Sequence, residues 1–173
     1  IIEWPHRKEH SIELQIPLLQ FNMLNDFEIL PILTGSMHEY IEGIKDIKDN
    51  ELKILTDNLQ KVLIEYGKPY IIIAGADLAH IGAQFGDSYT LDPFTLTRSK
   101  NKDEEILTCV KEIDADAFFG SIKSEKDARR ICGLTPIYFL LTLMRGCTAE
   151  IVNYDQWSDG NSSVSFAGAV FYK

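Results

Sequence analysis

The sequence predicts an α/β fold: a layered, mostly parallel central sheet flanked by helices. Strand-like and helical segments alternate along the chain, which is the pattern of such a fold. The run "YIIIAGA" at 70–76 is continuously apolar and stands between turn signals. Runs of this kind are typical of strands buried on both faces of a parallel sheet. A length of 173 residues is that of one domain, so we expect 1–173 to form a single domain.

The first half of the chain contains two helical patterns and one further strand-like segment. The segment "EHSIELQIPLLQF" at 9–21 fits a buried helix with a defect at Pro17, although its alternation also fits a strand through residue 18. Residues 27–33 predict a strand. Residues 38–66 carry helical periodicity, which Gly67 ends.

The second half is richer in helix and ends in two strands. The apolar spacing predicts helices near 99–112, 114–124 and 134–145, a strand at 149–155, a turn at 158–161 and a last strand at 163–172.

Charge and composition exclude several classes of function. The net charge is −9, which disfavours electrostatic binding to nucleic acid or to an anionic membrane. No apolar run is long enough to span a bilayer. The three cysteines contain no CxxC pair, so we expect reduced thiols and a cytoplasmic protein.

Asp77 and His80 follow the most apolar predicted strand in "GADLAHIG". Ligands of open α/β sheets bind beyond the carboxyl ends of the strands, where a carboxylate and an imidazole could both reach a metal ion. The D-x-x-H spacing is a weak motif, so an aspartate that caps a helix and a histidine that fills a pocket is an equal alternative.

Two further residues are candidates for the same chemistry. His10 would complete a set of two histidines and one carboxylate, the type that suits non-haem iron. His6 stands one helical turn before it. Cys132 precedes a predicted helix and follows Arg129 and Arg130, an environment that favours a thiolate as ligand or nucleophile. A small buried residue in a tight turn is the alternative for this cysteine.

Four blocks together resemble one family. They are "EHSIELQIPLLQ" (9–20), "ADLAHIG" (76–82), "ICGLTPIYFLL" (131–141) and "SSVSFAGAVFY" (162–172). In this order and spacing the sequence resembles the Memo family, which includes the proteins called AmmeMemoRadiSam system protein B. The resemblance implies a fold similar to class III extradiol dioxygenases, which are non-haem iron enzymes.

The resemblance also implies a site. At the positions that match the family's motifs, His10, Asp77, His80 and Cys132 would be the catalytic and metal-ligating residues, with iron or copper as the metal. The family carries a further site histidine in an earlier block, and we expect this sequence to lack that N-terminal segment.

Three functions remain open from the sequence. The first is a metal-dependent redox enzyme of unknown small-molecule substrate, similar to non-haem iron dioxygenases. The second is an inactive binding or adaptor protein whose cleft takes a peptide or protein partner. The third is an enzyme with Cys132 as nucleophile and His80 as base. The family's name links it to a radical S-adenosylmethionine protein as a functional partner.

Overall fold

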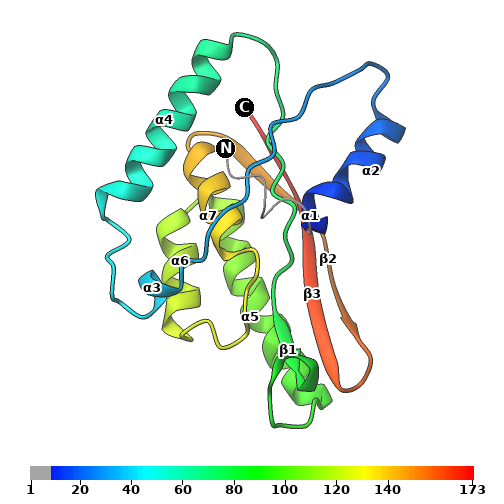
Figure 1. Ribbon diagram of the computed structural model, residues 1–173. Coiled ribbons are helices and arrows are strands. Elements are labelled where there is room, and N and C mark those ends of the chain that lie inside the picture. The colour runs from blue at the N-terminus through cyan, green and yellow to red at the C-terminus, as the bar shows by residue number, and fades with distance from the viewer. Residues whose placement is uncertain (1–8) are drawn as a thin grey trace. The chain divides into compact units, whose positions relative to one another are not determined.

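The computed structural model describes residues 9–173. The chain forms two compact units, Ile1–Gly35 and Ser36–Lys173, which are described separately here (Figure 1).

The first unit contains two short helices, α1 (His10–Glu13) and α2 (Gln15–Asn22), separated at Leu14. Pro17 lies in the first turn of α2, where its missing N–H would have no partner within the helix in any case. The helical interpretation of this segment is therefore confirmed, but its expected burial is wrong, since neither helix contains a buried residue.

The strand expected at 27–33 is absent. Within the described part of the chain, this segment forms no backbone hydrogen bond with another segment. Pro31 removes one donor, and Ile29 and Leu30 are exposed. An apolar segment without a partner backbone cannot form a ladder.

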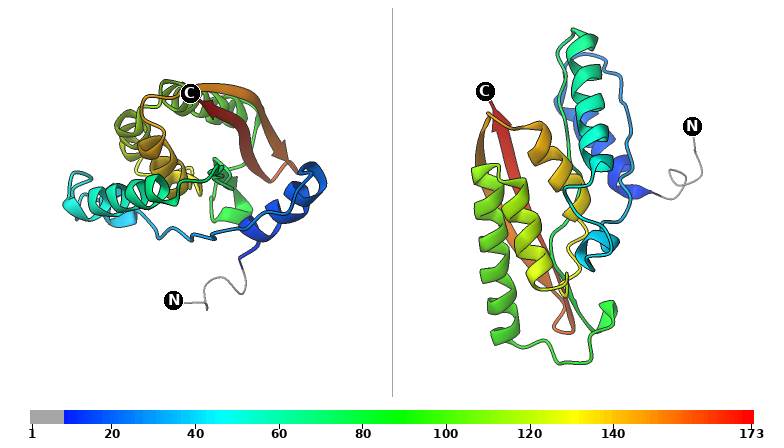
Figure 2. Two further views of the ribbon diagram at one scale, coloured as in Figure 1. Left: turned by 90° about the horizontal axis from the view of Figure 1, so that it is seen from above. Right: turned by 90° about the vertical axis from the view of Figure 1, so that its left-hand side faces the viewer.

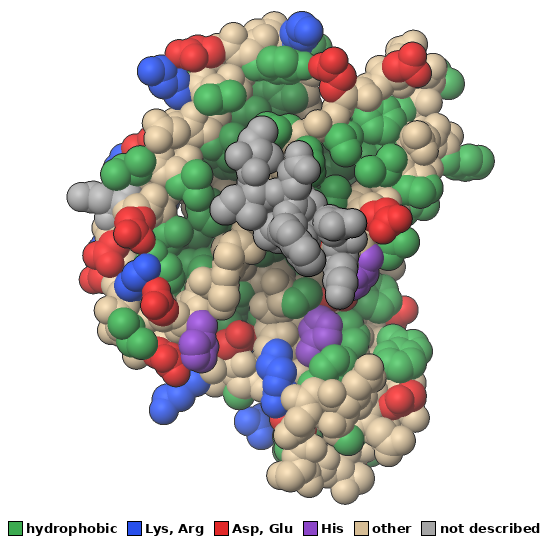
Figure 3. All heavy atoms as spheres, in the orientation of Figure 1, with side chains coloured by type: hydrophobic (Ala, Val, Ile, Leu, Met, Phe, Trp, Pro, Cys, Tyr) green, Lys and Arg blue, Asp and Glu red, His purple; other side chains and the backbone are tan. Residues whose placement is uncertain are grey.

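The second unit begins with α3 (His38–Ile41) and α4 (Asn50–Tyr66). The single helical pattern at 38–66 is interrupted at Gly43, which adopts a positive φ of 76°. Gly67 ends α4 in the left-handed conformation, as predicted. Several apolar side chains of α4 remain exposed, and hydrophobic side chains reach the surface where this helix lies in Figure 3.

Three longer helices follow: α5 (Pro93–Glu112), α6 (Ala115–Ser124) and α7 (Leu134–Leu143). The side chain of Asp92 accepts a hydrogen bond from Thr95 N at 2.7 Å, and Pro93 begins the helix, so α5 starts earlier than its apolar spacing indicates. Asp114 caps α6 in the same way. These helices confirm the expectations for the second half.

The sheet has three strands, β1 (His80–Gly82), β2 (Thr148–Ser158) and β3 (Ser162–Tyr172), in the order β1-β3-β2. Both pairings are antiparallel. The predicted mostly parallel sheet is therefore wrong. A short turn joins β2 to β3, and such a turn permits only antiparallel neighbours.

The predicted strand at 70–76 is also wrong. These residues have no regular secondary structure, and β1 begins only at His80. Only His80–Gly82 form a strand here, and they pair with Ser162–Val164 of β3. Strand propensity alone did not decide pairing here.

The core lies between the helices and one face of the β2–β3 hairpin. Figure 2 shows α5 along this face, with α6 packed against α5 and α7 packed against α6. Ile106, Phe118, Ile122 and Leu141 are fully buried at its centre. No helix among the described residues is long and apolar enough to cross a membrane.

Candidate metal and thiol site

The loop that carries Asp77 and His80 is anchored to β3. Leu78 N donates to the carbonyl of Ser165 at 2.8 Å, and Ala79 N donates to Ser165 Oγ at 2.9 Å. Leu78 and Ala79 are buried, whereas Asp77 is exposed and His80 is half-buried. The buried pair thus fixes the loop and leaves the two polar side chains on its accessible side.

His80 is held on three sides. Its backbone N–H donates to the carbonyl of Arg129 at 2.7 Å, and its ring meets Phe85 edge-on at 5.0 Å between centroids. Nδ1 lies 3.2 Å from the carbonyl of Leu78. Because a carbonyl can only accept, this contact favours a proton on Nδ1 and leaves the lone pair of Nε2 available. Nε2 lies 3.9 Å from Asp77 Oδ2.

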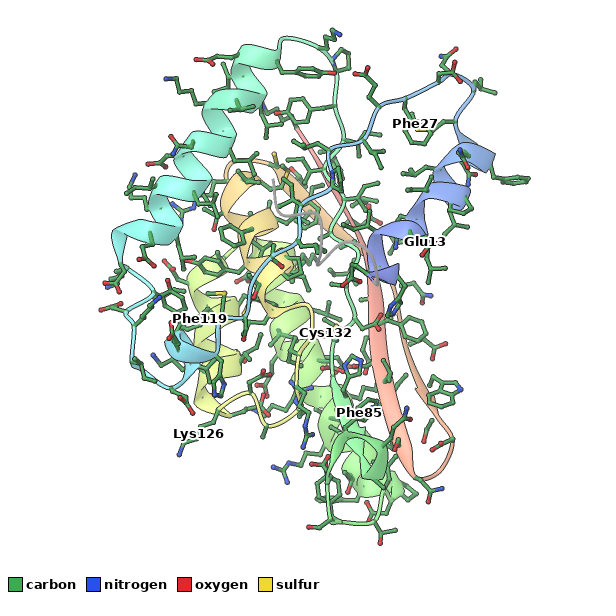
Figure 4. All side chains as sticks on the ribbon, viewed as in Figure 1. Glu13, Phe27, Phe85, Phe119, Lys126 and Cys132 are labelled. Carbon is green, nitrogen blue, oxygen red and sulfur yellow. The ribbon has the colours of Figure 1, made fainter. Side chains whose placement is uncertain are left out.

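Cys132 reaches the same place through a close approach of two loops. Gly133 N donates to the carbonyl of Asp77 at 2.9 Å, and Cys132 Sγ lies 3.5 Å from that carbonyl. A Cβ on Gly133 would stand 2.6 Å from the same oxygen, so only glycine permits the contact. Figure 4 shows Cys132 in the loop before α7.

The side chains of Asp77, His80 and Cys132 converge. One ligand atom from each lies within 4.8 Å of the other two, and no other trio of His, Cys, Asp or Glu among residues 9–173 meets this condition. A carboxylate oxygen, an imidazole nitrogen and a sulfur suit iron, copper or zinc, whereas calcium and magnesium prefer oxygen alone. The donor set therefore fits the iron or copper that the resemblance implies.

His10 is the first residue of α1 and is exposed. It belongs to the unit Ile1–Gly35, whereas the three converging residues belong to Ser36–Lys173. Its role as a fourth ligand therefore stays a prediction. His6 lies outside the described residues.

Sequence reasoning missed an ion pair that supports the loop. Arg130 Nη2 lies 2.7 Å from Asp87 Oδ1, and Arg130 Nη1 donates to the carbonyl of His80 at 3.3 Å. Asp87 Oδ2 also accepts from Gly82 N and from the Tyr89 hydroxyl. The hydrogen bond from Arg130 is the main cause that lowers the pKa of Asp87 to about 2. The sequence drew attention to Arg130 only as a neighbour of Cys132, and it gave no sign that Asp87 is its partner.

A second ion pair lies beneath the site. Arg129 Nη1 pairs with Asp103, which is completely buried, and Arg129 Nη2 lies 3.2 Å from Glu125 Oε1. The hydroxyl of Tyr154 donates to Asp103 Oδ2 at 2.9 Å. Burial, and then the negative charge of Asp103, raises the pKa of this hydroxyl. The network joins α5 and β2 to the residue whose carbonyl binds His80 N.

The fold is that of an α/β protein, in which a layer of helices covers an antiparallel hairpin. Its Asp–His–Cys cluster, at the start of β1, is a candidate transition-metal site. The chain belongs to the Memo family, whose profile, described as "Memo-like protein", matches residues 3–170. This confirms the resemblance seen in the four sequence blocks.

Curated relatives in archaea and bacteria support the assignment. The chain is 29% identical to a MEMO1 family protein of Methanosarcina mazei over 97% of this chain and 57% of the relative. It is 30% identical to one of Methanobrevibacter smithii over 96% of this chain and 52% of the relative. For one of Aquifex aeolicus the identity is 26%, over 96% of this chain and 41% of the relative. The chain thus spans about half the length of these relatives.

Proposed function

We propose that this protein is a metal-dependent redox enzyme, similar to non-haem iron dioxygenases, that acts on a small molecule. Asp77, His80 and Cys132 would hold iron or copper, with His10 as a further ligand and catalytic residue. The observation that carries the proposal is the convergence of three chemically suitable ligand atoms within 4.8 Å. A cytoplasmic location and a functional link to a radical S-adenosylmethionine protein belong to the same proposal.

The surroundings of His80 support this role. Contact with the carbonyl of Leu78 fixes the ring and directs the proton to Nδ1, which is the usual way that proteins orient a histidine ligand. Arg130 and Asp87 hold the backbone of the same loop. Bound iron or copper would supply redox chemistry and would polarise a coordinated substrate.

Metal content tests the proposal directly. The chain would be purified without added metal or chelator, reconstituted anaerobically with Fe(II) or Cu, and analysed by inductively coupled plasma mass spectrometry. We expect close to one metal ion per chain in the parent. In Asp77→Ala and in His80→Ala, the affinity for the metal should fall on the order of 10-fold or more. His10→Ala tests the fourth ligand.

His38→Ala is the matched control, because His38 is exposed and pairs with Glu42 outside the cluster. It should keep the metal. Circular dichroism would show whether each variant remains folded. A parent chain that takes up neither metal after reconstitution would contradict a metal site built on the residues of this chain alone and would favour a binding or adaptor protein.

A second candidate, a cysteine-nucleophile enzyme, is favoured by one observation: the exposed thiol of Cys132 lies in the same cluster as the imidazole of His80. In such an enzyme His80 Nε2 would accept the thiol proton while the sulfur adds to a substrate carbonyl carbon, whose C=O π electrons move to the oxygen.

Alkylation rates separate this candidate from the metal enzyme. Iodoacetamide should label Cys132 faster than Cys109, whose thiol has its pKa raised by burial and nearby acids. His80→Ala should slow labelling of Cys132 alone, and a chelator should not change it. Labelling of Cys132 that begins only after a chelator removes metal would instead identify Cys132 as a ligand.

A further inference from the structure

The outer edge of β1 is closed by a loop instead of by another strand. Backbone N–H and C=O groups alternate between the two edges of a strand. The N–H of Ala79 donates to Ser165 Oγ at 2.9 Å and its C=O accepts from Ser165 N at 3.0 Å, so both groups face β3. Alternation directs the same two groups of His80 to the opposite edge. There its N–H donates to the carbonyl of Arg129 at 2.7 Å and its C=O accepts from Arg130 Nη1 at 3.3 Å, so two consecutive arginines bind both groups.

These arginines belong to the loop 125–133 between α6 and α7, and Figure 4 shows Lys126 and Cys132 toward its two ends. Lys126, Asp127 and Arg130 adopt positive φ angles of 53°, 49° and 52°. Such angles are uncommon for residues other than glycine, and they persist where the surroundings determine the backbone. The shape of this loop therefore depends on what its side chains bind.

The side chain of Arg129 turns inward. Its guanidinium bonds to Asp103 of α5 and to both carboxylate oxygens of Glu125. The hydroxyl of Tyr154 in β2 donates to the second oxygen of Asp103 at 2.9 Å. We call Arg129, Asp103 and Tyr154 the buried arm. Because a buried ion pair often stabilises a fold no more than apolar side chains of the same volume, we attribute a geometric role to this arm.

The side chain of Arg130 turns outward and forms an exposed arm with Asp87. Hydrogen bonds of 2.7 and 3.2 Å join its guanidinium to both oxygens of Asp87. The same carboxylate accepts from Gly82 N at 2.8 Å, so this arm is attached to the far end of β1. The two arms thus hold the main chain of His80 from the core and from the surface.

The bound main chain determines where the ring of His80 lies. With its N–H and C=O both bound, rotation about the backbone bonds of this residue is restricted, and the direction of its Cα–Cβ bond is fixed. That direction places Nδ1 3.2 Å from the carbonyl of Leu78 and leaves Nε2 3.9 Å from Asp77 Oδ2. This precision matters at a binding site, because the geometry of its side chains must be held within about 0.5 Å.

We propose that Arg129 and Arg130 are positioning residues that clamp the main chain of His80 and thereby orient its ring. In this arrangement the hydroxyl of Tyr154, on a strand that carries none of the candidate ligands, acts on His80 through Asp103 and Arg129. All of these residues belong to the unit Ser36–Lys173. That the oriented ring serves as a metal ligand rests on the proposed function, whereas the clamp itself does not.

Nuclear magnetic resonance of the metal-free chain tests the clamp. Tyr154→Phe removes one hydroxyl from the buried arm, and Arg130→Gln removes the guanidinium of the exposed arm, where the side chain is 41% exposed. Long-range ¹H–¹⁵N spectra at about pH 8, where an ordinary histidine is neutral, report the tautomer of His80. We expect Nδ1–H alone in the parent and a mixture of both tautomers in each variant. The amide of His80 should exchange with deuterium on the order of 10-fold faster in each variant, beyond any change at the fully buried Ile106.

Tyr138→Phe is the matched control. Tyr138 packs in the same core, on α7, and its hydroxyl forms no hydrogen bond within residues 9–173. The tautomer and the amide exchange of His80 should be the same in this variant as in the parent. An effect of a lost core hydroxyl on packing alone would appear in this variant as well.

Titration with Co(II), followed by absorption spectroscopy, connects the clamp to the metal site. Arg130→Gln removes a positive charge near the cluster, and Coulomb interaction alone would then strengthen the binding of a cation. The clamp predicts the opposite, a loss of Co(II) affinity on the order of 10-fold, and the same loss in Tyr154→Phe. If the parent binds no Co(II), the proposed metal site fails, and the tautomer and exchange data still decide the clamp.

The proposal is overturned by any of the following results. One is a His80 that keeps a single tautomer and its exchange rate in Tyr154→Phe or in Arg130→Gln. Mixed tautomers in the parent would show that the ring is not held. Equal acceleration of exchange at His80 and Ile106 would mean that the variants lose stability alone. Where the parent binds Co(II), binding at least as tight in the two variants would show that the clamp does not orient a ligand.

Discussion

Residues 70–76 and 78–82 are both rich in apolar side chains and are separated only by Asp77, yet they differ in burial and in backbone pairing. Leu78, Ala79 and Ile81 are buried and bonded to β3, whereas Ile71 and Ile73 are exposed and form no backbone hydrogen bond with residues 9–173. The composition of the two stretches does not explain this. The difference is the presence of a partner backbone, because a strand is stable only when another segment takes its hydrogen bonds. We call residues 78–82 the anchored part and residues 70–76 the unpaired part. Asp77 lies between them, and His80 lies in the anchored part.

Loss of the buried carboxylate beneath the anchored part should have the largest effect. Asp103→Ala leaves the buried guanidinium of Arg129 with Glu125 as its remaining carboxylate partner and the Tyr154 hydroxyl without its acceptor, and we expect it to lower the free energy of unfolding by about 3 kcal/mol. Urea unfolding followed by circular dichroism measures this. The control is Glu104→Ala, at the next position on α5. It breaks only an exposed contact with Lys100 and should lower the free energy of unfolding by less than about 1 kcal/mol. Equal losses in the two variants would contradict the role of the network.

Truncation inside the anchored part should come next. Ile81 is 2% exposed, and Ile81→Ala should lower the free energy of unfolding by about 3 kcal/mol through lost burial and a new cavity. A loss below about 1 kcal/mol would show that β1 packs loosely, and the contrast between the two stretches would disappear.

Removal of the Asp87 carboxylate, the partner of Arg130, should have a smaller and pH-dependent effect on the free energy of unfolding. The folded-state pKa of Asp87 is lowered from its ordinary 3.8 to about 2, so its contribution is present above pH 3.8 and is lost as the pH falls toward about 2. Since Arg130 is partly exposed, we expect Asp87→Asn to cost about 1 kcal/mol at neutral pH. Urea midpoints at several pH values measure this. A variant with the same acid dependence as the parent would contradict the assignment.

Truncation in the unpaired part should have the smallest effect. Ile71→Ala removes a side chain that is already largely in water, so the free energy of unfolding of the chain alone should change by no more than about 0.5 kcal/mol. Urea unfolding measures this alongside Ile81→Ala. A loss as large as that of Ile81→Ala would mean that residues 70–76 are packed in solution.

The helices show how far local pattern reaches. Gly67 as the end of α4 and the bounds of α6 followed from periodicity and capping chemistry, which involve residues only a few positions apart. The strands predicted at 27–33 and 70–76 do not form, because neither segment has a partner backbone among residues 9–173. Whether a partner exists cannot be predicted from the residues of the segment itself. The parallel sheet was mispredicted for a related reason. Alternating elements suggested crossovers, but a short turn joins the two long strands.

The candidate site divides in the same way. Asp77, His80 and Cys132 were selected from residue chemistry and from family resemblance, and the tertiary structure brings their ligand atoms together. Arg130 and Asp87 were not selected, since their pairing across 43 positions leaves no local signal.

By itself, the sequence determined where most of the helices lie, the family and the residue types able to bind a metal, because caps, periodicity and motifs are local properties of the chain. Only the tertiary structure decided which strands pair and how Cys132 meets Asp77, since that contact depends on a glycine that lets two distant loops touch at 2.9 Å between Gly133 N and the carbonyl of Asp77.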